Sequence, residues 1–262
     1  MSHKNPYTVF HNLLGNNFIA GTTNAFIWFA LTYWTFLETR SVLVTSWIAG
    51  IFTVANMFSA LFLGAFVDHH TKKNVMLVSS IGSLLAYSLA AMIYFSHSGT
   101  WTDITSVRLW CLILALMAGS IIGNVRNIAM TTLITFLFSG DERAKANGKV
   151  GAINGLSFGI TSIASGLVIG FLGMKWVLIA SVVLTIVALL HLFTVPCPEE
   201  KSREAEEKKP MKMDFRGTLK LVRSVPGYIW LIFLVTFNNF LGGVFMALMD
   251  AYGLSLVSVQ VW

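Results

Sequence analysis

One charged residue lies deep inside an apolar stretch of this 262-residue sequence. Arg126 falls within the apolar run 109–137, with Asn124 and Asn127 beside it. A charged side chain at the centre of a membrane costs roughly 2.5–3.5 kcal/mol on insertion scales and usually faces a cavity or a partner. Two interpretations stay open. Arg126 binds a substrate or balances a proton-carrying acid, or it is a structural arginine that pairs with helix carbonyls or extends to the membrane surface.

Amides and aromatic side chains alternate in two other apolar runs. Asn24 and Trp28 lie in the run 13–37, and Asn238 and Asn239 lie in the run 228–249. Aromatic walls with a few polar groups are typical of sites for bulky, partly apolar molecules. The alternative is that the rings face lipid while the amides join helices. His191, near the end of another run, is interpreted as a packed or interfacial histidine.

A glycine pattern in the run 150–172 has two interpretations, a helix-packing surface and a hydrolase motif. Gly151, Gly155 and Gly159 recur every four residues, which lets helix backbones approach closely or supplies a bending point. Ser157 lies between two of them in a formal G-x-S-x-G, the motif of hydrolase nucleophiles. That motif needs a strained strand-to-helix turn, whereas here it lies within an apolar helix. We therefore expect helix packing and no enzyme.

Composition identifies the solvent of these runs as lipid. Only 11% of the residues are charged and 55% are hydrophobic, whereas soluble domains carry about 25% charged residues. The sequence predicts an all-α integral membrane protein, because about 20 apolar residues cross the hydrocarbon core as a helix. No metal-ligand, P-loop or dinucleotide motif occurs, so no cofactor or metal is expected. We expect seven spans: 13–37, 42–66, 75–95, 109–137, 150–172, 176–195 and 228–249.

The basic residues predict the orientation of these spans. With a cytoplasmic N-terminus, the inside segments carry 14 of the 18 lysines and arginines, the outside segments carry three, and Arg126 is the last. This asymmetry follows the positive-inside rule and suits a multi-pass protein of the cell membrane. The basic residues are spread over short loops rather than gathered on one domain, so no nucleic acid is expected as a partner.

A polar segment divides the spans into two unequal groups. Residues 1–195 are expected to form a six-span bundle, 196–227 a cytoplasmic linker, and 228–262 the seventh span with the start of a second bundle. The linker has mixed charge between prolines, which is typical of a solvated connection. Near its end, Phe215, Leu219 and Val222 recur at helical spacing, which predicts a short amphipathic helix before Pro226 and Gly227 break it.

The loop after the second span carries a recognisable motif. It begins at Gly64 and continues through Asp68 to Lys72 and Lys73, with His69 and Thr71 between them. This spacing resembles the G-x-x-x-D-R-x-G-R-K/R loop of the major facilitator superfamily, with His69 in place of the usual arginine and Thr71 in place of the usual glycine. The resemblance implies a major-facilitator-like six-helix N-terminal bundle plus one helix of the second bundle. It also implies a gating role for Gly64, Asp68, Lys72 and Lys73.

Within that superfamily the chain looks most like drug- and macrolide-efflux permeases, although the arginine usual early in their fourth span falls near Gly119 here. The resemblance implies proton-coupled efflux of a drug-like molecule by alternating access. It places spans 1, 4 and 7 around the substrate cavity, with Asn24, Trp28, Arg126, Asn127, Asn238 and Asn239 in its wall. The expected partners are the lipid bilayer, a small-molecule substrate and H+. Seven spans suggest a truncated chain that lacks its C-terminal half, so an inactive partial transporter or a non-transporting interaction subunit remains the alternative.

Overall fold

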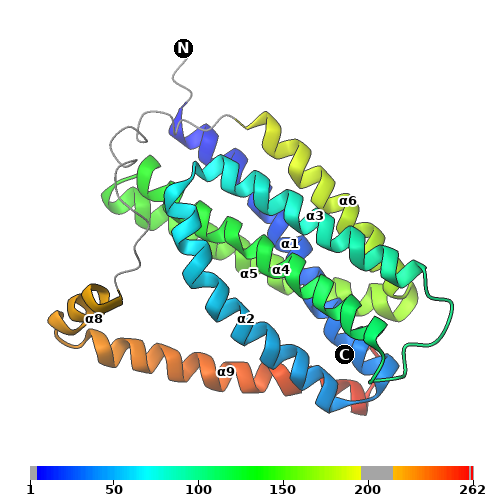
Figure 1. Ribbon diagram of the computed structural model, residues 1–262. Coiled ribbons are helices and arrows are strands. Elements are labelled where there is room, and N and C mark those ends of the chain that lie inside the picture. Colours follow the sequence, from blue (N-terminus) through cyan, green and yellow to red (C-terminus); the bar gives the residue numbers. More distant parts are fainter. Residues whose placement is uncertain (1–4, 196–214, 260, 262) are drawn as a thin grey trace.

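The computed structural model describes residues 5–195, 215–259 and 261, and every described element is a helix. The helices are α1 (Pro6–Thr39), α2 (Val42–His69), α3 (Lys72–Phe95), α4 (Val107–Leu137), α5 (Gly140–Phe171), α6 (Met174–Thr194), α8 (Phe215–Ser224) and α9 (Tyr228–Leu256). Figure 1 shows the first six as a bundle of long, roughly antiparallel rods, with α8 and α9 along one side. The expected all-α fold is therefore confirmed.

Single residues turn the chain between successive helices. Arg40 takes the left-handed conformation (φ 52°) at the end of α1, and Ser41 caps α2 by accepting a bond from the Val44 amide at 3.4 Å. Gly173 (φ 81°) joins α5 to α6, because a side chain is rarely tolerated at that backbone angle. Gly227 (φ 78°) separates α8 from α9, where Pro226 and Gly227 predict a break.

Helix α1 runs through the centre of the bundle. It contacts α2, α4, α5, α6 and α9, while α3 packs along α4 and α6 on the outside. Figure 1 shows α1 crossing behind α3 and α4 along much of its length. The first span of the chain is consequently the one most enclosed by other helices.

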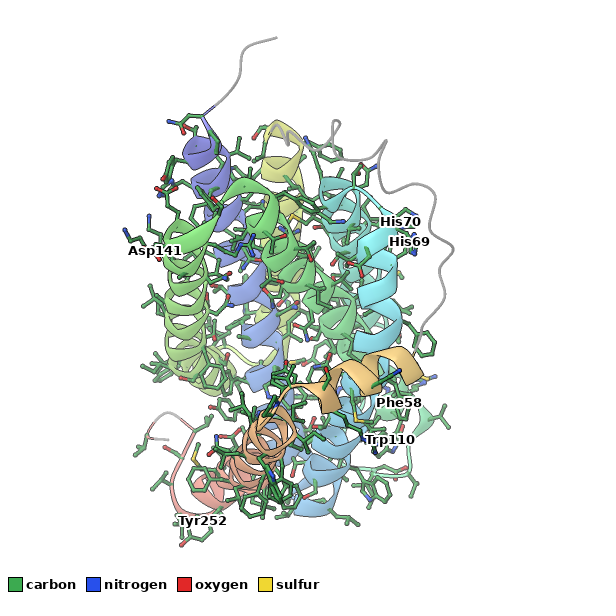
Figure 2. All side chains as sticks on the ribbon, turned by 90° about the vertical axis from the view of Figure 1, so that its left-hand side faces the viewer. Phe58, His69, His70, Trp110, Asp141 and Tyr252 are labelled. Carbon is green, nitrogen blue, oxygen red and sulfur yellow. The ribbon has the colours of Figure 1, made fainter. Side chains whose placement is uncertain are left out.

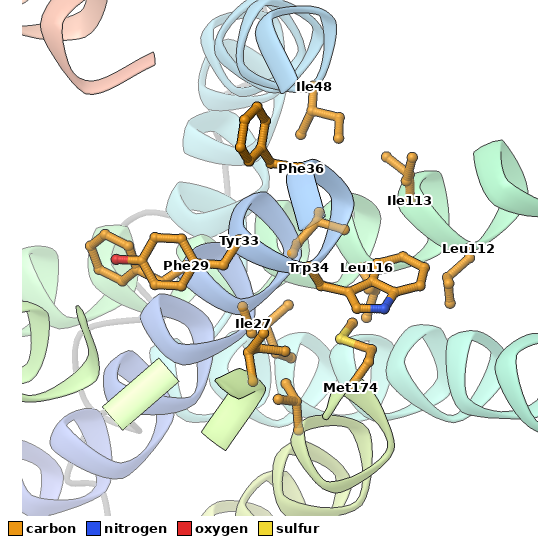
Figure 3. Close-up of a cluster of buried hydrophobic side chains, with 14 of the residues drawn as sticks. Ile27, Phe29, Tyr33, Trp34, Phe36, Ile48, Leu112, Ile113, Leu116 and Met174 are labelled. Carbon is orange, nitrogen blue, oxygen red and sulfur yellow. The ribbon is translucent and has the colours of Figure 1, made fainter. Parts of the chain in front are cut away.

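Two apolar cores hold the bundle at its opposite ends. One core lies near the N-terminus and contains Phe10 and Leu13 of α1 with Met130 of α4. The other lies toward the far end and contains Ile27 and Leu31 of α1, Leu116 of α4 and Met174 at the start of α6, as Figure 3 shows for part of it. Buried polar residues lie between the two cores along α1, α3, α4, α5 and α6.

We call the buried polar residues between the two cores the polar midlayer. Its members are Asn16, Asn17 and Thr23 of α1; Ser79, Ser80 and Ser83 of α3; Ser120 and Arg126 of α4; Ser157, Thr161 and Ser165 of α5; and Ser181 and Thr185 of α6. Buried polar groups must find hydrogen-bond partners inside a membrane, since lipid supplies none. The midlayer therefore joins helices by hydrogen bonds where the cores join them by packing.

Six of the described helices are long and apolar enough to cross a membrane, and α1 is not among them. This differs from the seven expected spans, because the amides and hydroxyls of α1 lower its hydropathy. Its central position explains the exception, since neighbouring helices rather than lipid surround it. Helix α5 also begins at Gly140 rather than at 150, because its polar first turns continue the helix beyond the apolar run.

Helix α9 contrasts with the bundle. Its residues are exposed from Tyr228 through Phe245, and burial begins only near its end, at Ala251, Gly253 and Leu254. Figure 2 shows the two ends of the molecule: His69, His70 and Asp141 lie toward the end that carries the N-terminus, and Tyr252 lies at the opposite end. The terminal part of α9 contacts α1 and α2 there.

Candidate functional site

Arg126 is enclosed in the polar midlayer by neutral groups. Its side chain is 3% exposed, and its guanidinium donates to the side-chain oxygens of Asn16 and Ser80 and, at 3.5 Å, to the carbonyl of Met76. The Nε–H has no partner, and no ion pair to Arg126 is found within the part of the chain that the structure describes. The guanidinium thus brings a full positive charge to the bundle centre, held only by dipoles.

Asn24 joins three helices beside this arginine. Its Oδ1 accepts from the hydroxyl of the fully buried Tyr87 at 2.7 Å, and its Nδ2 donates to the Ser120 carbonyl at 3.2 Å and to Asn124 Oδ1 at 3.5 Å. The amide of Asn24 is therefore committed to α3 and α4. We conclude that its first role is to fix α1 against those helices.

Two glycines of α4 make this contact possible. A side-chain carbon on Gly119 would overlap the ring of Tyr87, and one on Gly123 would overlap the amide of Asn24. The ring of Tyr87 thus fills the space that a side chain at position 119 would need. Small residues at helix interfaces allow such close approach.

A cavity of about 280 Å³ opens beside Arg126. The structure brings Asn24, Trp28, Arg126 and Asn127, four of the expected site residues, to its wall. Phe52 of α2 and Phe158 of α5 add aromatic surface, and Asn17, Asn124 and Asn154 add amides. Trp28 and Phe52 lie with ring centroids 4.3 Å apart, so the aromatic part of the wall is continuous between α1 and α2.

The sequence analysis missed Asn154, Phe52 and Ser157 in this wall. Asn154 and Ser157 are three residues apart and share a helix face, and Ser157 accepts a bond from Thr22 at 3.1 Å. The polar spacing of Asn154 and Ser157 in α5 is the signal that the sequence contains for this wall. The glycine pattern of the same helix indicates a different face. Phe52 carries no signal of its own, since many phenylalanines of the chain face outward.

Asn238 and Asn239 lie elsewhere. Both are exposed on α9, and neither lines the cavity around Arg126. Their place in a substrate cavity stays a prediction. Met249 and Asp250 of α9 border two further cavities of about 510 and 240 Å³, each shared with Phe29 of α1.

The loop between α2 and α3 is fastened by its lysines. Lys72 is buried, donates to the carbonyls of Val67 at 2.8 Å and His70 at 3.2 Å, and lies 5.7 Å from the ring centroid of Phe136. Lys73 donates to the carbonyl of Val195 at 2.5 Å. Cations at the ends of helices neutralise the partial negative charge of the last carbonyls. The two lysines therefore tie α2, α3, α4 and α6 together at this end.

Gly64 and Asp68 occupy the last turns of α2. Open space surrounds Gly64, and the side chain of Asp68 is exposed. Thr71, rather than Asp68, is the residue that precedes α3, and it forms no side-chain cap. The expected gating role of these two residues remains a prediction.

The glycine pattern of α5 faces away from the bundle. Gly151, Gly155 and Gly159 are exposed or open, with no atom of another residue near the place of a side chain. The face that packs on α1 carries Ser157, Thr161 and Ser165 instead, and Ser165 donates to the carbonyl of Phe26 at 3.1 Å. Close helix packing of the glycine face is therefore still a prediction.

The arrangement defines a class of protein: a multi-pass helical membrane protein with a polar cavity between its helices. A family model described as the Major Facilitator Superfamily matches residues 13–262, and the chain belongs to this superfamily of transporters. No curated protein and no solved structure matches the chain significantly. The family supports membrane transport of a small molecule.

Proposed function

We propose that this protein exports a bulky, partly apolar molecule across the cell membrane by alternating access, with Arg126 as a substrate-binding cation. The observation that carries this proposal is the cavity of about 280 Å³ in the middle of the bundle. Midplane cavities between helices are where secondary transporters hold their substrates. Trp28, Phe52 and Phe158 offer aromatic surface there.

The chemistry of the wall narrows the substrate. Asn127 accepts from Asn17 through its Oδ1 at 3.4 Å, and its amide N–H groups donate to no other described residue; Asn154 adds a second amide. Arg126 supplies donors only. The substrate class that these groups favour is a drug-like molecule with an aromatic or aliphatic body and a carbonyl, carboxylate or ether oxygen that accepts hydrogen bonds.

The direction and energy source follow from the resemblance and the charge distribution. The proposal places the N-terminus in the cytoplasm because basic residues favour that side. The α2–α3 loop, with Gly64, Asp68, Lys72 and Lys73, then lies at the cytoplasmic surface as a gate. We propose H+ as the coupling ion. This is supported by Asn16, whose side chain hydrogen-bonds to both Arg126 and His191.

Efflux from cells that express the full open reading frame tests the proposal. Cells would be loaded with a fluorescent, oxygen-rich aromatic compound, and Arg126→Ala is expected to slow its efflux by about tenfold or more, because a charge-assisted contact is lost. Arg108→Ala is the matched control, since Arg108 lies exposed on the same helix beside His97. Membrane levels of both variants would be measured by immunoblot.

Two outcomes contradict the proposal. Equal efflux by Arg126→Ala and the unaltered protein at equal membrane level would exclude Arg126 from the substrate site. Efflux indistinguishable from that of cells with empty vector would contradict transport of these compounds and favour a membrane interaction subunit.

A further inference from the structure

Asn16 connects the buried Arg126 to a partly exposed histidine. Its Oδ1 accepts from the Arg126 guanidinium, and its Nδ2 donates to the Ala188 carbonyl at 2.7 Å and contacts His191 Nδ1 at 3.1 Å. Asn16 itself is fully buried, whereas His191 lies in the last turn of α6 and is partly exposed. One amide thus bridges a cation in the midlayer and a titratable ring near the helix end.

The partners of Asn16 fix the protonation state of His191. The guanidinium can only donate, and a backbone carbonyl can only accept, so Oδ1 must face Arg126 and Nδ2 must face Ala188. The second Nδ2 hydrogen then faces His191 Nδ1, which must accept it. This network requires a neutral imidazole that carries its hydrogen on Nε2.

A proton on His191 Nδ1 breaks this arrangement. Two donors would then meet at 3.1 Å, and Asn16 would have to turn its Oδ1 toward the imidazolium. That rotation points Nδ2 at Arg126, where donor again meets donor. In the rotated form the guanidinium loses its Asn16 acceptor and keeps only Ser80 and the Met76 carbonyl.

Other charged groups lie around His191 and affect the rotation of Asn16. Within the described ranges, the titratable or charged side chains at this end of the helices that pack on α6 are Tyr7 and His11 (α1), Lys72 and Lys73 (α3) and Asp141, Glu142, Arg143, Lys145 and Lys149 (α5), with Arg126 of α4 behind Asn16. Lys73 lies closest along α6, at the carbonyl of Val195, one turn beyond His191.

We propose that His191 is a proton-binding site that controls the availability of Arg126 through Asn16. With His191 neutral, Asn16 holds the guanidinium in the midlayer. With His191 protonated, the guanidinium is released toward the cavity of about 280 Å³ that it already lines. Linkage of this proton to transport rests on the proposed function, whereas the switch itself concerns only the chain. Histidine suits the task because it changes charge between about pH 5 and 8.

Nuclear magnetic resonance of the full chain in nanodiscs, with 15N-labelled histidine and arginine, tests the switch without a substrate. At high pH we expect His191 to show an unprotonated Nδ1 and a protonated Nε2. As the pH falls, protection of the Arg126 guanidinium from hydrogen exchange, measured relative to free arginine at the same pH, should drop at least about tenfold, because a hydrogen bond to a charged group is lost. In His191→Gln, whose side-chain oxygen accepts from Asn16 at any pH, this relative protection of Arg126 should not change with pH.

Two further variants separate the switch from a general effect of pH. His97→Gln removes a partly exposed histidine outside the site and should keep the unaltered pH dependence at Arg126. Asn16→Asp retains an acceptor for Arg126 but presents an acceptor to His191, so His191 should hold its proton to a pH higher by about one unit or more. This variant keeps the acceptor of the buried arginine and loses the donor to the Ala188 carbonyl.

Three results would overturn the switch: a neutral His191 that carries its hydrogen on Nδ1, a pH-dependent relative protection of Arg126 that persists in His191→Gln, or an unchanged titration of His191 in Asn16→Asp. These measurements involve no transported molecule, so their failure leaves the proposed export standing. Conversely, a failed efflux test with Arg126→Ala removes the substrate role while the proton switch stands.

Discussion

Helices α1 and α9 invert the relation between polarity and burial that soluble proteins show. Helix α1 carries so many amides and hydroxyls that it falls outside the group of helices apolar enough to span a membrane, yet it lies at the centre of the bundle. Helix α9 meets that criterion and is exposed from Tyr228 through Phe245. Where lipid is the solvent, an apolar surface needs no cover, whereas polar groups must be enclosed with partners.

Helices α1 and α9 are also held in the molecule by different contacts. Helix α1 gains its place through apolar packing at both ends and hydrogen bonds in the midlayer, and the same midlayer holds the cavity. Among its described residues, helix α9 is buried only near its end, around Ala251. Substitutions of one residue type should therefore have different effects in the two helices.

The largest difference in stability loss between α1 and α9 is expected when a large apolar side chain is removed. Leu31 of α1 is 1% exposed and lies in the core of Figure 3, so Leu31→Ala should lower the free energy of unfolding by about 2–5 kcal/mol through lost packing. Phe240 of α9 is 63% exposed, and Phe240→Ala should change the free energy of unfolding by less than about 0.5 kcal/mol. Denaturant titration in mixed micelles measures both, and equal losses would refute the contrast.

An added methyl group should have opposite signs in the two regions. Gly123 of α4 faces the amide of Asn24, so Gly123→Ala should destabilise the protein by about 1–3 kcal/mol through overpacking. Gly242 of α9 has open space around it, and Gly242→Ala should stabilise its helix by up to about 1 kcal/mol. The same titration gives both values. A loss of stability in both variants would mean that α9 has close neighbours along its length.

The sequence predicts the helices well and their contacts poorly. Apolar runs place most helix ends within a few residues, whereas α1 and α5 begin well before their runs and α9 ends beyond its run. The helical spacing of Phe215, Leu219 and Val222 predicts α8. The predicted linker at 196–214 lies outside the described residues. Arg126, Asn24 and Asn127 stand out as polar groups in apolar surroundings, which is a property of the sequence alone. That Asn24 is committed to Tyr87, and that Asn16 bridges Arg126 and His191, depends on how α1 is enclosed, which no local pattern contains.

The smallest effect is expected from a single hydroxyl. Tyr87→Phe keeps the ring against Gly119 but removes the donor to Asn24, so the free energy of unfolding should fall by about 0.6–1.7 kcal/mol, the range of hydrogen bonds between membrane helices. Asn239→Leu, which replaces an exposed amide of α9 by an apolar side chain, should cause no loss.

A double-mutant cycle of Tyr87→Phe with Asn24→Ala isolates the coupling between the two side chains, because each single variant removes the same hydrogen bond. A coupling near zero would mean that the apolar cores alone hold α1 at the centre. The amides would then be free to serve the cavity, since Asn24 would no longer be needed to anchor α1 to α3 and α4. A coupling within the expected range would instead make Tyr87 the residue that prevents Asn24 from turning toward a substrate.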